Sequence, residues 1–255
     1  MLMCFCIDAS SLKTMVDNIS IMAIVNLTPD SFWAPSRVSA DKALSRIAEL
    51  CEKGADIIDI GAVSTRPGAS DVDVETEWMR LEPVLKSLGK NHVPISIDTT
   101  SSEIVSRAYS LIGPFIVNDI SAGEDDPSML SLVGRLKLSY IAMHKRGNPR
   151  TMDSRCDYEN GVVESLLSYF DSFALKAAEY GIEDWILDPG LGFAKTNEQN
   201  WDILHRLSEF KRFQRPILIG AADKRFTQGD TPKAHRLAAS NGADILRVHD
   251  VVNIF

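Results

Sequence analysis

The sequence predicts an α/β protein, a (β/α)8 TIM barrel of eight parallel strands and their connecting helices, and three observations support this. Eight short apolar runs recur along the 255 residues. Most are continuous in Val, Ile and Leu, as expected of strands that are buried on both faces in a parallel sheet. Amphipathic stretches separate the runs, and about 250 residues is the usual size of such a barrel.

The eight expected strands span residues 21–28, 55–62, 93–99, 114–120, 138–144, 184–190, 216–222 and 243–250. The expected helices include 42–52, 75–88, 162–180 and 198–210. A doubly wound open sheet is the alternative architecture. That fold typically carries a Gly-rich phosphate loop after its first strand, and residues 26–32 (NLTPDSF) do not form one.

Polar residues follow nearly every expected strand at its C-terminal end. They are Asn26, Thr65, Arg66, Asp98, Asn118, His144, Asp188, Lys224, Arg247 and His249. The functional groups of barrel enzymes project from this end of the strands, so we expect these side chains to converge on one active-site rim.

Length and composition indicate one domain, residues 1–255, with residues 1–20 as an N-terminal capping segment. The net charge of −8 argues against a nucleic-acid partner, which calls for a basic face. We find no signal peptide and no apolar stretch near the roughly 18 residues of a membrane span. A cytoplasmic protein is therefore expected, and its four cysteines are expected to be reduced thiols.

The C-terminal region is short for a complete barrel. About twenty residues separate the seventh and eighth expected strands, and five follow Asp250, whereas an average helix needs roughly 11 residues. We therefore expect a shortened seventh helix and a missing or incomplete eighth one. Outward apolar residues of the last strand, such as Ile245 or Leu246, would then be exposed unless the N-terminal segment or a partner subunit covers them.

Seven segments, in order along the chain, resemble the dihydropteroate synthase family. They are IVNLTPDSF (24–32), GADIIDIGAVSTRPGA (54–69), ISIDT (95–99), VNDI (117–120), MHKRGNPRTM (143–152), ILDPGLGFAKT (186–196) and GADILRVHDV (242–251). The resemblance implies a transferase of folate biosynthesis that moves the dihydropterin-6-ylmethyl group from its diphosphate to p-aminobenzoate, with release of pyrophosphate. It also implies Mg²⁺, inhibition by sulfonamides, and a homodimer through the C-terminal helical face that is reduced here.

For the pterin, the resemblance implies that Asp98, Asn118 and Asp188 hold the ring edge and that Met143 packs on its face. These residue types suit the ring, because its N–H and NH2 groups need carboxylate acceptors and an amide can both donate and accept.

For the leaving pyrophosphate, the resemblance implies donors from Thr65, Arg66, Arg247 and His249. Developing charge on phosphate oxygens is usually stabilised by such cations and by a metal. Asn26 is the implied Mg²⁺ ligand, since Mg²⁺ takes few protein oxygens and completes its shell with water and phosphate. Loss of pyrophosphate would leave a cation delocalised into the pterin, so no protein nucleophile is required.

For the second substrate, the resemblance implies contacts from Gly192, Phe193 and Lys224, and it makes Lys224, Asp98 and Arg247 the catalytic residues. The family pattern Ser-Arg-Lys-Ser-Phe reads Ala-Asp-Lys-Arg-Phe at residues 222–226. Loss of a hydroxyl and gain of a carboxylate should weaken the contact with the carboxylate of p-aminobenzoate.

Two other functions stay open on the sequence. One is a non-catalytic pterin-binding paralogue, motivated by Ala222, Asp223 and the missing final helix. The other is a corrinoid-linked methyltransferase domain with the same pterin barrel, which the loops at 28–37 and 64–73 argue against. Both loops are rich in Pro, Ser and Asp, and we expect them to act as lids.

Overall fold

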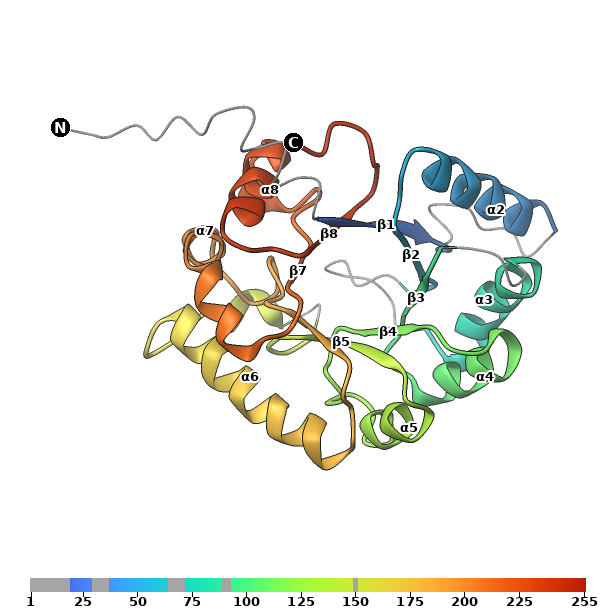
Figure 1. Ribbon diagram of the computed structural model, residues 1–255, viewed down its shortest axis with the longest axis horizontal. Helices are drawn as coiled ribbons and strands as arrows, with labels where there is room; N and C mark the ends of the chain where they lie inside the picture. The colour runs from blue at the N-terminus through green and yellow to red at the C-terminus, as the bar shows by residue number, and fades with distance from the viewer. Residues whose placement is uncertain (1–18, 29–36, 64–71, 89–92, 149–150) are drawn as a thin grey trace.

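A computed structural model describes residues 19–28, 37–63, 72–88, 93–148 and 151–255. Its eight parallel strands form one sheet in the order β6-β5-β4-β3-β2-β1-β8-β7, and Figure 1 shows the helices arranged around this sheet. The strands are β1 Ser20–Asn26, β2 Ile57–Gly61, β3 Ile95–Asp98, β4 Ile116–Asp119, β5 Ser139–Met143, β6 Trp185–Asp188, β7 Leu218–Ile219 and β8 Ile245–Val248. The helices are α2 Arg37–Glu52, α3 Val74–Leu88, α4 Ser102–Ile112, α5 Met129–Leu136, α6 Val162–Glu179, α7 Asn197–His205 and α8 Thr231–Ser240. The predicted (β/α)8 barrel is confirmed.

The two ends of the sheet meet at β6 and β7. Leu187 and Ile217 form a parallel bridge there, and the Leu187 amide donates to the carbonyl of Pro216 at 2.9 Å. The strands therefore close around a common axis.

Apolar side chains fill two layers of the molecule. One cluster lines the inside of the barrel with one residue from each of seven strands: Met22, Ile57, Ile116, Ile141, Ile186, Leu218 and Ile245. A much larger cluster packs the outer face of the strands against the helices. Successive side chains of a strand point to opposite faces, so the inward set can be read along each strand in steps of two.

Local signals explain how the loop after β6 enters its helix. Thr196 caps α7 by accepting from the Gln199 amide at 3.2 Å, and the Gln199 side chain accepts from the Thr196 amide at 2.8 Å. This reciprocal capping box fixes the start of the helix and so the end of the preceding loop.

The C-terminal region confirms one prediction and corrects another. The helix that follows β7, α8, has 10 residues, and the described residues 249–255 after β8 contain no helix. Ile245 and Leu246 are both buried, and the prediction that Ile245 points outward is wrong. Ile245 points into the barrel, and Leu246 belongs to the outer cluster, against which Val251 and Phe255 also pack.

Several sequence predictions lie outside the described residues. These are the capping segment up to residue 18, Thr65, Arg66, and most of the expected lids at 28–37 and 64–73. None of the helices in the described part of the chain is long and apolar enough to cross a membrane.

Candidate active site

The candidate site is the next inward layer of the barrel, toward the C-terminal ends of the strands. Two residues beyond the apolar interior cluster, the inward positions become Asp59, Asp98, Asn118, Met143, Asp188 and Arg247. Asn26 and His249 lie beyond this layer, farther toward the C-terminal ends of the strands. Asn26 pairs with Gly61 in the register of β1 and β2, and His249 directly follows β8. One alternation along each strand therefore brings the sequence-predicted residues of six strands to one end of the barrel.

Arg247 is held by two carboxylates from neighbouring strands. Its Nε donates to Asp59 Oδ2 at 2.7 Å, and its Nη2 lies 2.6 Å from the same oxygen and donates to Asp98 Oδ2 at 2.7 Å. Asp59 is fully buried, and a buried carboxylate needs such a charged partner. Nη1 forms no hydrogen bond with the described residues, which leaves it available for a ligand anion.

Asp59 also fixes the orientation of Asn118. The Asn118 Nδ2 lies 3.3 Å and 3.2 Å from the two oxygens of Asp59. An ionised carboxylate can only accept, so the amide nitrogen must face it and the amide oxygen must point away. Asn118 is thus held with a defined acceptor and donor edge toward the barrel mouth.

Asp188 ends β6 and is oriented by the turn that follows it. Its Oδ1 accepts from the Gly190 amide at 2.7 Å. Gly190 has φ of 69°, and a Cβ at this position would lie 2.1 Å from the carbonyl oxygen of His144. Only glycine allows the turn to approach the end of β5 this closely.

Lys224 lies against the same turn from the opposite side. Its Nζ is 4.4 Å from the centroid of the Phe193 ring, a cation–π contact. A Cβ on Gly192, whose φ is 78°, would come within 3.1 Å of Lys224 Cδ. The predicted trio Gly192, Phe193 and Lys224 therefore lies together, with glycine leaving room for the lysine.

Burial perturbs the charges of this layer. Burial raises the pKa of Asp98 to about 7. The charge of Arg247 opposes this rise, and the charge of Asp59 adds to it. Burial likewise raises the pKa of Asp188, whereas it lowers the pKa of Lys224 to about 8, assisted by the charge of Arg247. Perturbed groups gathered in one place are typical of functional sites.

Two further predicted residues, His249 and Asn26, lie near the rim, whereas His144, also expected there, packs against Tyr169 of α6. His249 Nε2 is 3.8 Å from the carboxylate of Asp223, and the side chain of Asp223 is 82% exposed. Asp223 adopts φ of 56°, a left-handed conformation that Asp tolerates better than most residues. Asn26 Oδ1 and Asp98 Oδ2 would each be 3.7 Å from a Cβ placed on Gly61, so both oxygens flank this glycine.

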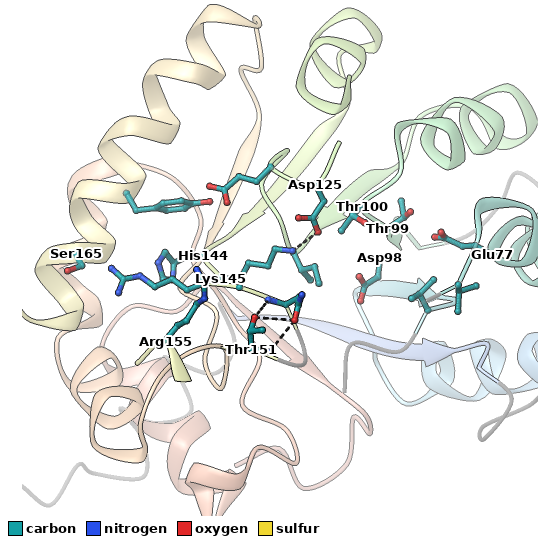
Figure 2. A pocket seen from close by; sticks show the side chains of 18 of the residues that line it. Glu77, Asp98, Thr99, Thr100, Asp125, His144, Lys145, Thr151, Arg155 and Ser165 are labelled. Carbon is teal, nitrogen blue, oxygen red and sulfur yellow. Dashed lines mark hydrogen bonds and ion pairs between the residues drawn. The ribbon is translucent and has the colours of Figure 1, made fainter. Parts of the chain in front are cut away.

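A cavity of about 1180 Å³ opens beside this layer and reaches it at Asp98. Figure 2 shows Glu77, Asp98, Thr99 and Thr100 on one side of it, and His144, Lys145, Arg155 and Ser165 on the other. Lys145 and Asp125, which both line the cavity, form an ion pair. Asn118, Asp188, Lys224 and Arg247 are not among the residues that line it, so it is an approach to the site rather than the site itself.

Sequence reasoning missed two residues that organise this layer, Asp59 and Lys195. A signal existed for Asp59: it interrupts the apolar run of β2 two residues after the interior residue Ile57, and a charge in a buried strand needs a partner on the inside. Lys195 is only 8% exposed, but as a lysine in a polar loop it gave no comparable signal.

The arrangement suits a flat, uncharged ring with several N–H donors. Two buried carboxylates and an oriented amide can accept from and donate to one edge of such a ring, while Met143 lies on the same inward face. Arg247 and Lys224 place positive charge beside it for an anionic group. Fold and site together define an α/β barrel whose strand ends suit a planar heterocycle that carries an anionic group.

Comparison with known proteins specifies the family. The family model described as pterin binding enzyme matches residues 22–249. A dihydropteroate synthase from Synechocystis is 39% identical over 91% of this chain and 85% of that protein. The crystal structure of a dihydropteroate synthase from Clostridium difficile superposes with a TM-score of 0.85 at 34% identity, covering 93% of each chain. The chain belongs to the pterin-binding enzymes and, within them, to the dihydropteroate synthase family.

The folic acid synthesis protein of Pneumocystis carinii is 41% identical over 92% of this chain. The chain spans only 34% of the length of that protein. The match therefore concerns one part of the longer fungal protein.

Proposed function

We propose that this chain is a dihydropteroate synthase. It would transfer the dihydropterin-6-ylmethyl group from its diphosphate to p-aminobenzoate, releasing pyrophosphate and forming dihydropteroate. The observation that carries this proposal is the layer of Asp98, Asn118 and Asp188 beside Arg247 and Lys224, in a chain of this family; Asn118 and Asp188 are buried, and the Asp98 side chain is 14% exposed. Support for the substrates comes from the Clostridium difficile structure, which was determined in the presence of pteroic acid, a pterin joined to p-aminobenzoate.

In this reaction Asp98 and Asp188 would accept from the pterin N–H and NH2 groups, and Asn118 would complete the ring edge. Met143, which is 3% exposed, would pack on the ring face. Arg247, oriented by Asp59 and Asp98, would direct Nη1 to the diphosphate. His249 at the rim, with Thr65 and Arg66 from the loop after β2, would supply further donors. Stabilising the departing pyrophosphate lowers the barrier to C–O cleavage.

We propose Mg²⁺ as the metal of the diphosphate, with Asn26 as its protein ligand. The described residues contain no group of three His, Cys, Asp or Glu side chains that could hold a metal. A single amide oxygen beside Asp98 fits an ion that keeps several waters and takes its other ligands from phosphate. Bound there, Mg²⁺ would neutralise charge on the leaving group.

The p-aminobenzoate ring would lie by Phe193, Gly192 and Lys224, where its amine can reach the methylene carbon of the pterin. Its carboxylate would face the segment that contains Ala222 and Asp223. The side chain of Asp223 is directed to His249, at 3.8 Å, and adds a negative charge at this rim. We therefore expect a high KM for p-aminobenzoate relative to that for the pterin substrate.

The proposal is tested by incubating the chain with dihydropterin diphosphate, p-aminobenzoate and Mg²⁺. We expect pyrophosphate and dihydropteroate to form in equal amounts, and a sulfonamide to inhibit competitively with p-aminobenzoate. An Asp98→Asn variant is the matched control, because it keeps the shape of the side chain and replaces an acceptor with a donor. Tight pterin binding without product would overturn the proposal and favour a non-catalytic pterin-binding protein.

Further properties are proposals on the same footing. We propose that the chain acts on small molecules rather than nucleic acid, which its net charge of −8 supports, and that it does so in the cytoplasm. We also propose a homodimer. Analytical ultracentrifugation over a range of protein concentrations measures this association.

A further inference from the structure

A buried lysine lies in the loop between β6 and α7, and the reaction proposed above does not use it. Lys195 is 8% exposed, although lysine is seldom buried without partners. Its Nζ lies 2.9 Å from the carbonyl oxygen of Gly190, 2.9 Å from that of Phe193, and 3.1 Å from His144 Nδ1. The ammonium group is therefore enclosed by acceptors from its own loop and from the end of β5.

Four acceptors surround the three protons of the ammonium group, since the His144 carbonyl oxygen also lies 3.5 Å from Nζ. The three shorter contacts, to the two loop carbonyls and to the His144 ring, would use all three protons. His144 Nδ1 must then accept, so its proton belongs on Nε2. His144 points outward from β5 toward α6, where its ring packs edge-on against Tyr169 at 4.8 Å between centroids, so both ends of this contact are fixed.

Both carbonyls held by Lys195 belong to residues whose other groups contact the site. The Gly190 amide orients Asp188, whose Oδ1 it contacts at 2.7 Å. Phe193 carries the ring that lies 4.4 Å from Lys224 Nζ. One side chain thus restrains the residue proposed to hold the pterin and the residue proposed to face the arylamine.

The loop needs such restraint because its backbone is unusual. Gly190, Gly192 and Ala194 have φ of 69°, 78° and 51°, so three of five consecutive residues are left-handed. Conformations of this kind persist only where surrounding contacts enforce them. Other hydrogen bonds also reach this loop. Tyr158 Oη donates to the Ala194 carbonyl at 3.0 Å, the Gly192 amide donates to Asn200 Oδ1 at 2.7 Å, and the Phe193 amide donates to the Gly190 carbonyl at 3.1 Å. Among these three, only the last reaches the Gly190 carbonyl, and none reaches the Phe193 carbonyl.

We propose that Lys195 is a positioning residue that ties the β6–α7 loop to the end of β5 and thereby sets the places of Asp188 and Phe193 for the two substrates. This inference rests on the proposed function for its substrates. The specific consequence is a loss of binding to both substrates, with the larger effect on p-aminobenzoate, because Phe193 lies farther from the strand that anchors Asp188.

The test compares Lys195→Met with Tyr158→Phe. Methionine has a similar length but no donors, and Tyr158→Phe removes one hydrogen bond to the same loop without touching the two restrained peptides. We expect Lys195→Met to raise the KM for p-aminobenzoate by about 10- to 100-fold, as for loss of a charged hydrogen bond, and the KM for dihydropterin diphosphate by less. Tyr158→Phe should leave both KM values within about twofold of those of the unmodified protein.

One result of this comparison would overturn the proposal, and another would refute the proposed function. A Lys195→Met protein with reduced thermal stability and unchanged KM values would show that the lysine only supports folding. An unmodified chain that forms no dihydropteroate would refute the proposed function instead, so the two failures are distinguishable.

A second measurement needs no variant of Lys195. The ¹⁵N NMR signals of the histidine rings report which ring nitrogen carries the proton, and a His144→Gln protein identifies the signals of His144. Burial lowers the pKa of Lys195 to about 7 and also lowers the pKa of His144, so at pH 6 we expect a protonated Lys195 beside a neutral ring with an unprotonated Nδ1 and a protonated Nε2. Finding the proton on Nδ1 would refute donation from Lys195 and overturn the proposal even if the Lys195→Met protein does not fold.

Discussion

Replacing Asp59 with Asn tests how the polar side chains of the site hold one another in place, because the change keeps the shape of the side chain and removes its charge. The Asp59 carboxylate receives Arg247 Nε and Nη2 at 2.7 and 2.6 Å and also receives Asn118 Nδ2. Removing one partner of a buried ion pair typically costs about 3–5 kcal/mol. Asp98 still receives Arg247 Nη2 at 2.7 Å, so we expect a loss near the lower end, about 3 kcal/mol of unfolding free energy.

The same change should also alter pterin binding. An Asn side chain at position 59 that keeps its oxygen toward Arg247 turns its NH2 group toward the NH2 group of Asn118. Two donors cannot pair, so Asn118 should rotate its amide and present its nitrogen to the mouth where its oxygen now lies. A ring N–H that loses its acceptor costs about 1–3 kcal/mol, which corresponds to roughly 10- to 100-fold weaker binding.

Urea unfolding measures the first effect, and calorimetry with 6-hydroxymethylpterin measures the second. Asp56→Asn is the matched control, since Asp56 Oδ2 accepts from the Ile21 amide at the opposite end of the barrel, at 2.7 Å. That variant should lose at most about 1 kcal/mol and keep its pterin affinity. Unchanged pterin affinity in Asp59→Asn would refute the assigned orientation of Asn118.

Three further predictions concern the same end of the barrel. Burial raises the pKa of Asp98 to about 7 and only its ionised form accepts from the ring, so calorimetric pterin affinity should fall as pH decreases through 7 and level off above it; a flat profile would contradict this. Gly190→Ala should cost at least about 2 kcal/mol more than Gly181→Ala in urea unfolding, because both glycines have φ of 69° but only the first would place a Cβ against backbone; equal losses would rule out the close approach. Ala222→Ser combined with Asp223→Arg should lower the KM for p-aminobenzoate about tenfold in steady-state assays by adding donors for its carboxylate, whereas an unchanged KM would place that carboxylate elsewhere.

The charged residues of the candidate site influence one another's protonation. Arg247 bridges Asp59 and Asp98, and its charge lowers the pKa of Lys224 after burial has done so. A substitution at any of these positions therefore changes the protonation of the others. Double-mutant cycles are needed to separate their contributions.

The positions of the strands and of most site residues could be predicted from the sequence. Apolar runs at residues 55–62 and 184–190 contain β2 and β6, and Asp98, Asn118 and Asp188 were expected at strand ends, where they lie. These features follow from local rules, since strand burial sets composition and the alternation of side chains has a period of two. The same alternation explains why Met143 faces inward and His144 outward.

Contacts between strands that are distant in sequence could not be predicted in this way. The inward direction of Ile245, which was expected to point outward, depended on the register of β8 in the closed barrel, and Leu246 is buried in the outer cluster. Likewise, Asp223 could be recognised as a departure from the family, but its position beside His249 depended on the loop conformation after β7.

The sequence by itself determined that this chain is a (β/α)8 barrel of the dihydropteroate synthase family with polar residues at its strand ends. Only the tertiary structure decided how those residues pair: Arg247 with Asp59 and Asp98, Asn118 with Asp59, and Lys195 with the end of β5. The physical reason is that composition and alternation are properties of each strand alone. The pairing of charges across 51 to 188 residues depends instead on sheet register and barrel closure, which no single segment encodes.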